Sequence, residues 1–309
     1  RWGVFGHYLA SPAGHGDQGV NSDQWNARVD AFDADALAGQ LRSVGAGYFF
    51  ITLGQGSGHY CAPNPTYDKL VSCAESKCSR RDLVRDIAEA LDAVDIPVLV
   101  YVPADGSWGD LPARRKLGMA HHWNDCPAGD YDWSRSRQPG FMHNWEAVVR
   151  DWSLRWGERV KGWWVDGCFR PEIRYPESEE PNFRTLAAAL RAGNKDSILA
   201  FNPCVNVPVI SCTIHEDFTA GEIAEGLPEC SGPWVENNGH RARLHILTYL
   251  GSDWGRGPIR FPDDLAAAYS RYVVSKGGVI SWDVPMEKQG TLCEEFLPPL
   301  RTVSAAVRS

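Results

Sequence analysis

Residues 160–167 read Val160-Lys161-Gly162-Trp163-Trp164-Val165-Asp166-Gly167, a short apolar run that ends in one carboxylate beside a glycine. A run of this length and composition predicts a buried strand of a parallel sheet. In α/β barrels, the catalytic residues stand at the carboxyl ends of such strands. We therefore interpret Asp166 as a catalytic nucleophile. The alternative is that Asp166 only caps the next turn through its Asp-Gly pair.

Short apolar runs alternate with longer helical patterns along the whole chain, which is typical of βα units that share a parallel sheet. Eight strands in this order predict a closed (β/α)8 TIM barrel, and we expect one domain over residues 1–309. The predicted strands are residues 3–9, 47–53, 97–102, 162–166, 197–202, 212–217, 244–250 and 278–283. The predicted helices are residues 35–44, 81–94, 145–156, 182–192, 263–276 and 293–307.

The composition is that of an ordinary globular protein, with 43% hydrophobic residues and a net charge of -8. This charge disfavours a nucleic acid or an anionic membrane as a partner, because both require a clustered basic face. No apolar run approaches the roughly 20 residues that span a bilayer. The sequence begins at Arg1 without a signal-like stretch, which suggests a mature or trimmed form. The 13 tryptophans favour a carbohydrate ligand, because sugar rings stack on indole faces.

Nine cysteines are many for a cytosolic enzyme, and they lack the paired spacing of a zinc site. We expect a secreted or periplasmic protein with one to four disulfides. The alternative is a cytosolic protein with several buried free thiols. Six of the cysteines form two loop groups, Cys61, Cys73 and Cys78 in one and Cys204, Cys212 and Cys230 in the other.

Several segments, in order along the chain, resemble the family 29 glycoside hydrolases, which are retaining α-L-fucosidases. They run from the first strand to the last, with no β-sandwich left over. They are Gly3-Val4-Phe5-Gly6-His7-Tyr8, Val44-Gly45-Ala46-Gly47-Tyr48-Phe49-Phe50-Ile51-Thr52-Leu53, Trp163-Trp164-Val165-Asp166-Gly167, Glu216-Asp217-Phe218-Thr219-Ala220-Gly221-Glu222, Pro233-Trp234-Val235-Glu236 and Ser252-Asp253-Trp254-Gly255.

Two places depart from the family pattern. Members usually carry two adjacent histidines and an aspartate after the second strand, where they bind fucose hydroxyls; this chain reads Gly54-Gln55-Gly56-Ser57-Gly58-His59. At the last strand, Trp282-Asp283-Val284-Pro285 replaces an asparagine-valine-glycine-proline turn. The resemblance therefore supports the reaction type better than the sugar, and it implies an α-L-fucoside, a modified fucose or a related L-sugar.

Retaining glycosidases need two carboxyl groups roughly 5 Å apart, one as the nucleophile and one as the general acid/base. Asp166 takes the first role. For the second we choose Glu222, which ends the family-like acidic segment, with Glu236 as the runner-up and His215 as a further alternative. Each glutamate has the alternative of being a solvated loop residue.

Polar and aromatic residues gather near the predicted strand ends and in the loops that follow them, where the resemblance and the barrel together place the sugar. Hydrogen bonds to hydroxyls and stacking on the sugar ring are their expected roles. The predicted substrate-binding residues are His7, Tyr8, Gln55, His59, Tyr101, Trp164, Asn202, His215, Asp217, Trp254 and Trp282. Trp163 and Trp164 point to opposite faces of their strand, so at most one lines the pocket.

We expect no cofactor and no catalytic metal. The pair His121-His122 lacks a third ligand at a useful spacing, and adjacent loop residues rarely bind one ion together. The expected partner is an oligosaccharide or glycoconjugate substrate, and the oligomeric state is left open. Three alternatives stand beside a retaining exo-glycosidase: a non-catalytic carbohydrate-binding barrel, a barrel glycosidase of other specificity, and an inverting enzyme or amidase.

Overall fold

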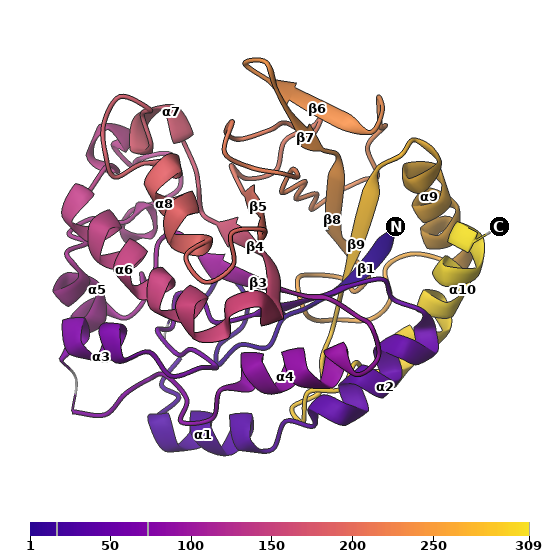
Figure 1. Cartoon of the computed structure of the whole chain (residues 1–309), viewed down its shortest axis with the longest axis horizontal. Coiled ribbons are helices and arrows are strands. Elements are labelled where there is room, and N and C mark those ends of the chain that lie inside the picture. The colour runs from indigo at the N-terminus through magenta and orange to yellow at the C-terminus, as the bar shows by residue number, and fades with distance from the viewer. Residues whose placement is uncertain (17, 73, 309) are drawn as a thin grey trace.

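The computed structural model describes residues 1–16, 18–72 and 74–308. Its main feature is a curled sheet of seven parallel strands, in the order β5-β4-β3-β2-β1-β9-β8 (Figure 1). These strands match seven of the eight predicted ones, with ends shifted by a few residues. Their bounds are β1 Trp2–Gly6, β2 Phe49–Thr52, β3 Val98–Pro103, β4 Val160–Asp166, β5 Ile198–Phe201, β8 His245–Tyr249 and β9 Val279–Val284.

Helices cover the outer face of the sheet, as expected for βα units (Figure 1). Apolar residues line the inner side of each long helix; α4, for example, buries Leu83, Ile87 and Leu91. The helices of the described residues are α1 Ser22–Asp30, α2 Ala34–Val44, α3 Pro65–Val71, α4 Leu83–Asp92, α5 Leu111–Leu117, α6 Pro139–Trp156, α7 Pro171–Arg174, α8 Phe183–Leu190, α9 Asp263–Ser275 and α10 Leu297–Arg308.

The alternation of side chains along β4 separates two hydrophobic cores. Trp163 points outward and stacks on Trp156 of α6, with ring centroids 5.6 Å apart. Trp164 points inward and stacks on Tyr101 of β3 at 5.5 Å. The first core joins the sheet to its helices, and the second fills the interior of the curled sheet beneath the carboxyl ends of the strands.

The place between β5 and β8 is taken by an irregular segment, residues 217–223, instead of a regular strand. It runs parallel to β8, where Leu247 N donates to the carbonyl of Gly221 and Ile223 N donates to the carbonyl of Leu247, each at 2.9 Å. Toward β5, its backbone bonds reach only Leu199. Side chains still alternate, with Phe218 facing the interior. A full (β/α)8 barrel is therefore not confirmed.

The predicted sixth strand at residues 212–217 is wrong, because this stretch folds as a turn around a buried carboxyl group. Glu216 accepts hydrogen bonds from the backbone N–H groups of Cys212 at 2.8 Å and Phe201 at 3.2 Å. Its side chain thus takes the place of a neighbouring strand's carbonyl. Burial raises the pKa of Glu216 to about 8.

A hairpin that we did not predict, β6 (Trp234–Asn237) and β7 (His240–Arg243), stands apart from the main sheet (Figure 1). Its turn is Asn238-Gly239, and both residues have positive φ. An Asn-Gly pair is the strongest short-range signal for such a turn. The hairpin places Glu236 on an exposed strand.

No disulfide joins any two of the eight cysteines within residues 1–16, 18–72 and 74–308. Cys73 lies outside the described residues. The expected disulfides are therefore not supported for the described cysteines. Burial raises the pKa of the Cys61 and Cys168 thiols far above the usual range, so both side chains pack as neutral apolar groups.

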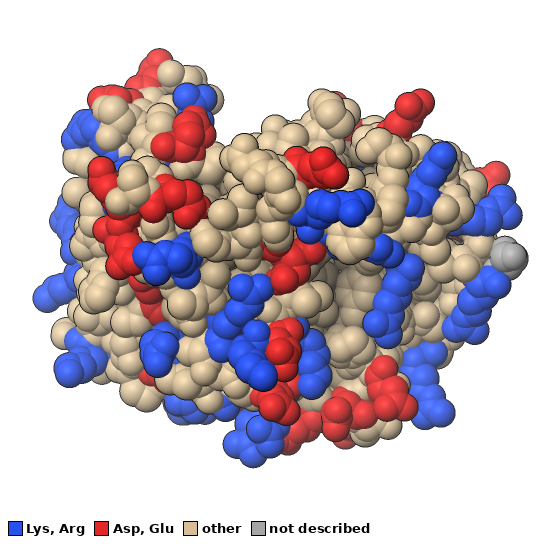
Figure 2. Space-filling model, turned by 45° about the horizontal axis from the view of Figure 1, so that its top comes forward, with Lys and Arg blue, Asp and Glu red and all other residues tan. Residues whose placement is uncertain are grey.

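Acidic and basic side chains are interspersed over the face of the molecule shown in Figure 2. Within the part of the chain that the structure describes, no helix has both the length and the apolar character needed to cross a membrane.

The approach of segment 217–223 to β8 requires a glycine at position 221. Gly221 has a φ of +61°, and a Cβ there would lie 1.9 Å from the carbonyl oxygen of His245. We predict that Gly221→Ala lowers the free energy of unfolding by about 3 kcal/mol or more, because the added Cβ can be accommodated only if the backbone of segment 217–223 or of β8 moves. Denaturant unfolding measures this loss. Gly226→Ala is the control, because Gly226 has a φ of +74° but no atom within 4 Å of the added Cβ. It should cost only about 1 kcal/mol, and equal losses would contradict the steric explanation.

Candidate active site

A pocket of about 220 Å³ opens at the carboxyl ends of the strands, inside the curl of the sheet. This is the end at which barrel enzymes place their active sites. Seven of the predicted site residues line it: His7, Gln55, Tyr101, Trp164, Asp166, Glu222 and Trp254.

The side-chain amide of Asn202 joins two carboxyl groups in this pocket. Its Nδ2 donates to Asp166 Oδ1 at 2.8 Å and to Glu222 Oε2 at 2.7 Å. Asn202 follows β5 and is fully buried, so it does not line the pocket but supports both acids from behind. One rigid donor thus fixes the position of the Asp166 carboxyl relative to that of Glu222.

Asp166 ends β4 and has a second set of donors. Gly167 N donates to Oδ1 at 2.8 Å, and Tyr101 Oη donates to Oδ2 at 2.6 Å. Gln55 Nε2 in turn donates to Tyr101 Oη at 2.7 Å. Oδ1 therefore has two donors and Oδ2 has one, so the free lone pair of this carboxylate belongs to Oδ2.

Glu222 has an environment that favours its protonated form. Burial is the larger cause and the charge of Asp166 the second, and together they raise the pKa of Glu222 to about 7. The hydrogen bond from Asn202 acts in the opposite direction, because it stabilises the carboxylate. A carboxyl group with this pKa can give and take a proton near neutral pH.

His7 is held by a buried carboxylate on the neighbouring strand β9. Its Nδ1 lies 2.6 Å from Asp283 Oδ1, while Asp283 Oδ2 accepts a hydrogen bond from Gly255 N at 2.6 Å. This contact is a hydrogen bond in the tautomer in which Nδ1 carries the ring proton and donates it to the Asp283 carboxyl oxygen. Asp283 was not predicted as a site residue, although its strand-end position next to β1 is a usable signal.

Loop residues complete the pocket, and most of them were not predicted. Asp105 is buried beside Arg174 and within 3.3 Å of His122 Nε2. Burial alone would raise the pKa of Asp105, but Arg174 and His122 hold it below its usual value. Arg174 also donates to the carbonyl of Gly167 at 2.5 Å, which braces the turn after Asp166. The other lining residues outside the prediction include Phe5, Trp108, Trp123, Asn124, Phe169 and Cys204.

Three predicted sugar contacts are buried on the outer side of the sheet. Tyr8 Oη donates to the backbone carbonyls of Arg28 and Lys288 at 2.8 and 3.0 Å, and Trp282 Nε1 donates to a serine of α9 at 2.9 Å. His59 is buried near Trp25. Successive side chains of a strand point to opposite faces of the sheet, so Trp282 points outward because Asp283 points inward.

Three other predicted residues lie away from the pocket. Asp217 sits at the opposite end of the sheet, where it pairs with Arg191 at 2.5 Å and lines a second cavity. His215 pairs with Glu177 at 3.1 Å and does not line the pocket. Glu236 stands on the exposed hairpin, 3.6 Å from Arg241. These placements correct the expectation that all three face the sugar.

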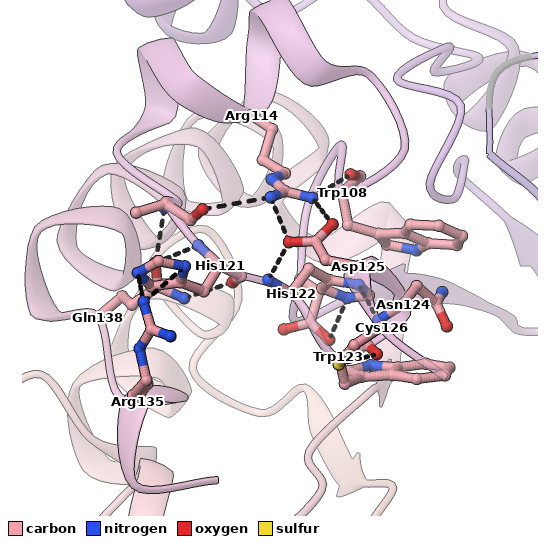
Figure 3. A network of polar contacts seen from close by, with 12 residues as sticks. Trp108, Arg114, His121, His122, Trp123, Asn124, Asp125, Cys126, Arg135 and Gln138 are labelled. Carbon is pink, nitrogen blue, oxygen red and sulfur yellow. Dashed lines mark hydrogen bonds and ion pairs between the residues drawn. The ribbon is translucent and has the colours of Figure 1, made fainter. Parts of the chain in front are cut away.

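No group of three or more His, Cys, Asp or Glu side chains within the described ranges is arranged to hold a metal ion. His121 contacts Arg135, whereas His122 points to Asp105 and stacks on Trp108, so the two adjacent histidines face different partners (Figure 3).

No protein-family model matches the sequence, and neither does any curated protein. The fold matches solved glycoside hydrolases. An endo-fucoidan hydrolase of glycoside hydrolase family 107 aligns with a TM-score of 0.72 and 15% identity, over 99% of this chain and 52% of that protein. The chain thus spans about half the length of that hydrolase.

Two α-L-fucosidases also match. Isoenzyme 1 from Paenibacillus thiaminolyticus has a TM-score of 0.66 and 19% identity, over 100% of this chain and 73% of that one. A fucosidase from Lactobacillus casei, solved with its α-L-fucose product, has a TM-score of 0.63 and 13% identity, over 94% and 85%. At these identities the likeness shows a shared fold and does not establish membership of family 29.

The shared donor leads to a prediction of opposite pKa changes in two variants. Asn202→Leu removes the hydrogen bond that stabilises the Glu222 carboxylate, so the pKa of Glu222 should rise above about 7. Asp166→Asn removes the neighbouring negative charge, so the same pKa should fall. The Glu222 carboxyl signal in a ¹³C NMR titration measures both.

Asn206→Leu is the matched control, because the Asn206 side chain bonds only the nearby carbonyl of Cys204. Its titration should follow the parent protein. A Glu222 pKa that moves the same way in Asn202→Leu and Asp166→Asn would contradict this account of the site.

Proposed function

We propose that this protein is a retaining glycoside hydrolase that acts on α-L-fucosides or a closely related L-sugar. Asp166 is the nucleophile and Glu222 is the general acid/base. The observation that carries the proposal is the pair of carboxyl groups joined by the Asn202 amide, because it brings two acids with different environments together in one pocket.

The spacing of the two acids favours the retaining mechanism. Both bridged oxygens lie within 2.8 Å of the same nitrogen, so they are no more than twice that length apart. Inverting enzymes separate their carboxyl groups by ~6.5–9.5 Å to admit a water, whereas retaining enzymes use about 5–5.5 Å. This short separation of the bridged oxygens supports the retaining arrangement over the inverting one.

In the first step, Asp166 Oδ2 attacks the anomeric carbon while Glu222 gives its proton to the glycosidic oxygen. The bond from that carbon to the leaving group breaks, and a covalent glycosyl ester forms on Asp166. Tyr101 holds the attacking carboxylate in place at 2.6 Å. Glu222 is suited to the acid role because burial and the charge of Asp166 raise its pKa to about 7, so a large share of its carboxyl groups is protonated near neutral pH.

In the second step, the Glu222 carboxylate takes a proton from water, and the resulting hydroxide oxygen attacks the anomeric carbon of the ester. Asp166 leaves as a carboxylate, and the sugar regains its original anomeric configuration. The formation of the ester removes the charge on Asp166, so the pKa of Glu222 falls when it has to act as a base.

The sugar assignment depends on two kinds of support. The sequence resembles family 29 enzymes at the first strand and at the nucleophile strand, and the fold matches structures of fucosidases and a fucoidan hydrolase. In the pocket, His7 and Gln55 supply polar groups, and Trp254 lies near His7, with ring centroids 6.0 Å apart. An indole beside polar groups suits a deoxysugar, which has an apolar methyl and several hydroxyls.

We predict that Asp166→Ala lowers kcat on an aryl α-L-fucoside by at least about 10³-fold, because the nucleophile is lost. Added azide should restore turnover and give the β-L-fucosyl azide, since azide then attacks directly from the nucleophile's side. A panel of other aryl glycosides, assayed in parallel, defines the sugar. A parent protein that cleaves no member of the panel, or an Asp166→Ala variant with parental turnover, would refute the proposal.

For Glu222→Ala, we expect a much larger loss on substrates with poor leaving groups than on activated aryl fucosides, because only the former need a proton during bond cleavage. Glu236→Ala is the comparison variant, and it should retain turnover because its carboxylate is on the exposed hairpin. Equal losses on both substrate types for Glu222→Ala would remove the acid role from this residue.

A further inference from the structure

One wall of the pocket is a row of aromatic side chains that the proposed reaction does not use. Trp108 and Trp123 line the pocket and are partly exposed, and the ring of His122 lies between them. His122 stacks on Trp108 at 4.9 Å with the rings 1° from parallel, and its centroid is 5.2 Å from Trp123. Phe169 continues the row, 5.5 Å from Trp123. All but Phe169 belong to the segment between β3 and α6, on either side of α5.

A network of polar contacts holds this row rigidly. Arg114 is buried and donates to both carboxylate oxygens of Asp125, at 2.7 and 2.6 Å. Asp125 also accepts from His122 N at 2.9 Å, and His122 Nδ1 accepts from Asn124 N at 3.2 Å. Figure 3 shows both indoles pointing to the same side, with Asn124 between them. Such a surface loses little entropy when it binds a ligand.

The enclosed space is small compared with this wall. A volume of about 220 Å³ lies below the ~300–1,000 Å³ of pockets for drug-sized ligands, so it suits one sugar ring. The indoles of Trp108 and Trp123 line this space and are partly exposed, and the side chain of Asn124 is exposed, so all three also present surface to solvent at the mouth of the pocket. Flat apolar faces next to an amide match a pyranose, which has C–H groups on its faces and hydroxyls at its edge.

We infer that the surface formed by Trp108, Trp123, Asn124 and Phe169 is a second sugar subsite, so the preferred substrate is an oligosaccharide whose next ring stacks on these side chains. This inference rests on the proposed function, because the first ring must occupy the pocket above Asp166. The subsite distinguishes a sugar at the second position from a simple aryl or alkyl group, since Asn124 adds hydrogen bonds that an apolar group does not use.

Calorimetric titration tests the subsite in the inactive Asp166→Ala protein. The ligands are methyl α-L-fucoside and a set of α-L-fucosyl disaccharides that differ in the second sugar and linkage. We expect at least one disaccharide to bind about tenfold tighter than the methyl fucoside, which corresponds to one additional stacked ring. Adding Trp123→Ala should reduce this ratio to about one, and Asn124→Ala should reduce it in part.

Trp234→Ala is the matched control, because Trp234 is an exposed tryptophan on the separate hairpin. It should leave the affinity ratio unchanged. Thermal melts confirm that each variant is folded, and Asn124→Ala provides a test on an exposed side chain if Trp123→Ala does not fold.

Two results would overturn the inference in distinguishable ways. If methyl fucoside binds but no disaccharide binds more tightly, or if Trp123→Ala and Asn124→Ala leave the ratio unchanged, the subsite is wrong and the proposed function stands. If neither the methyl fucoside nor any disaccharide binds, the proposed function fails and the subsite fails with it.

Discussion

The amide of Asn202 is the interaction on which the candidate site depends, because it is the only part of the described site that bonds both acids. It sits after β5 with no exposure to solvent, so its orientation is set by the fold. Asp166 comes from a regular strand and Glu222 from an irregular segment, and the common donor holds the two carboxyl groups close together. The same amide moderates the pKa of Glu222, which burial and Asp166 raise. Asn202 thus contributes both to the position of the two carboxyl groups and to the protonation of Glu222.

The rest of the fold supports this arrangement at two levels. Inside the curl of the sheet, Trp164 stacks on Tyr101 and donates to the carbonyl of Ala220 at 3.0 Å, so the floor of the pocket is joined to the segment that carries the acid. Below it, His245 contacts the carbonyls of the same segment, and burial lowers the pKa of His245 to about 4, so the ring remains neutral in the interior.

Much of the fold could be predicted from the sequence, because strands buried on both faces read as short apolar runs and the helices have clear apolar faces. The position of Asp166 at the end of a strand could be predicted for the same reason, because it ends such a run. The predictions were wrong where a side chain forms the hydrogen bonds of a missing strand, and where the direction of a side chain relative to the sheet decides its role. Residues 212–217 have the short pattern of a strand, but they fold as a turn in which the Glu216 carboxyl accepts the hydrogen bonds that a neighbouring strand would otherwise accept. Trp282 and Tyr8 point to the outer face of the sheet. A strand that is buried on both faces is apolar throughout, so its sequence does not show which side chains point to the interior of the curled sheet. The row of aromatic side chains was not predicted because most of its residues come from the irregular segment between β3 and α6, whose fold depends on the Arg114–Asp125 pair. The Asn238-Gly239 pair, in contrast, is a signal for a tight turn in the sequence itself.

The segment between β5 and β8 has a further consequence. Its backbone forms hydrogen bonds along β8, but its backbone hydrogen bonds to β5 reach only Leu199. The curled sheet is therefore weakly connected at this position. The hydrogen bond from Asn202 to Glu222 connects the two elements at the carboxyl end of β5. A hydrogen bond to a carboxylate is roughly twice as strong as one to a neutral acid. The connection between segment 217–223 and β5 is therefore stronger when Glu222 is ionised and weaker when Glu222 is protonated. A change in the protonation of Glu222 would therefore change how firmly segment 217–223 is held to the end of β5 in the curled sheet.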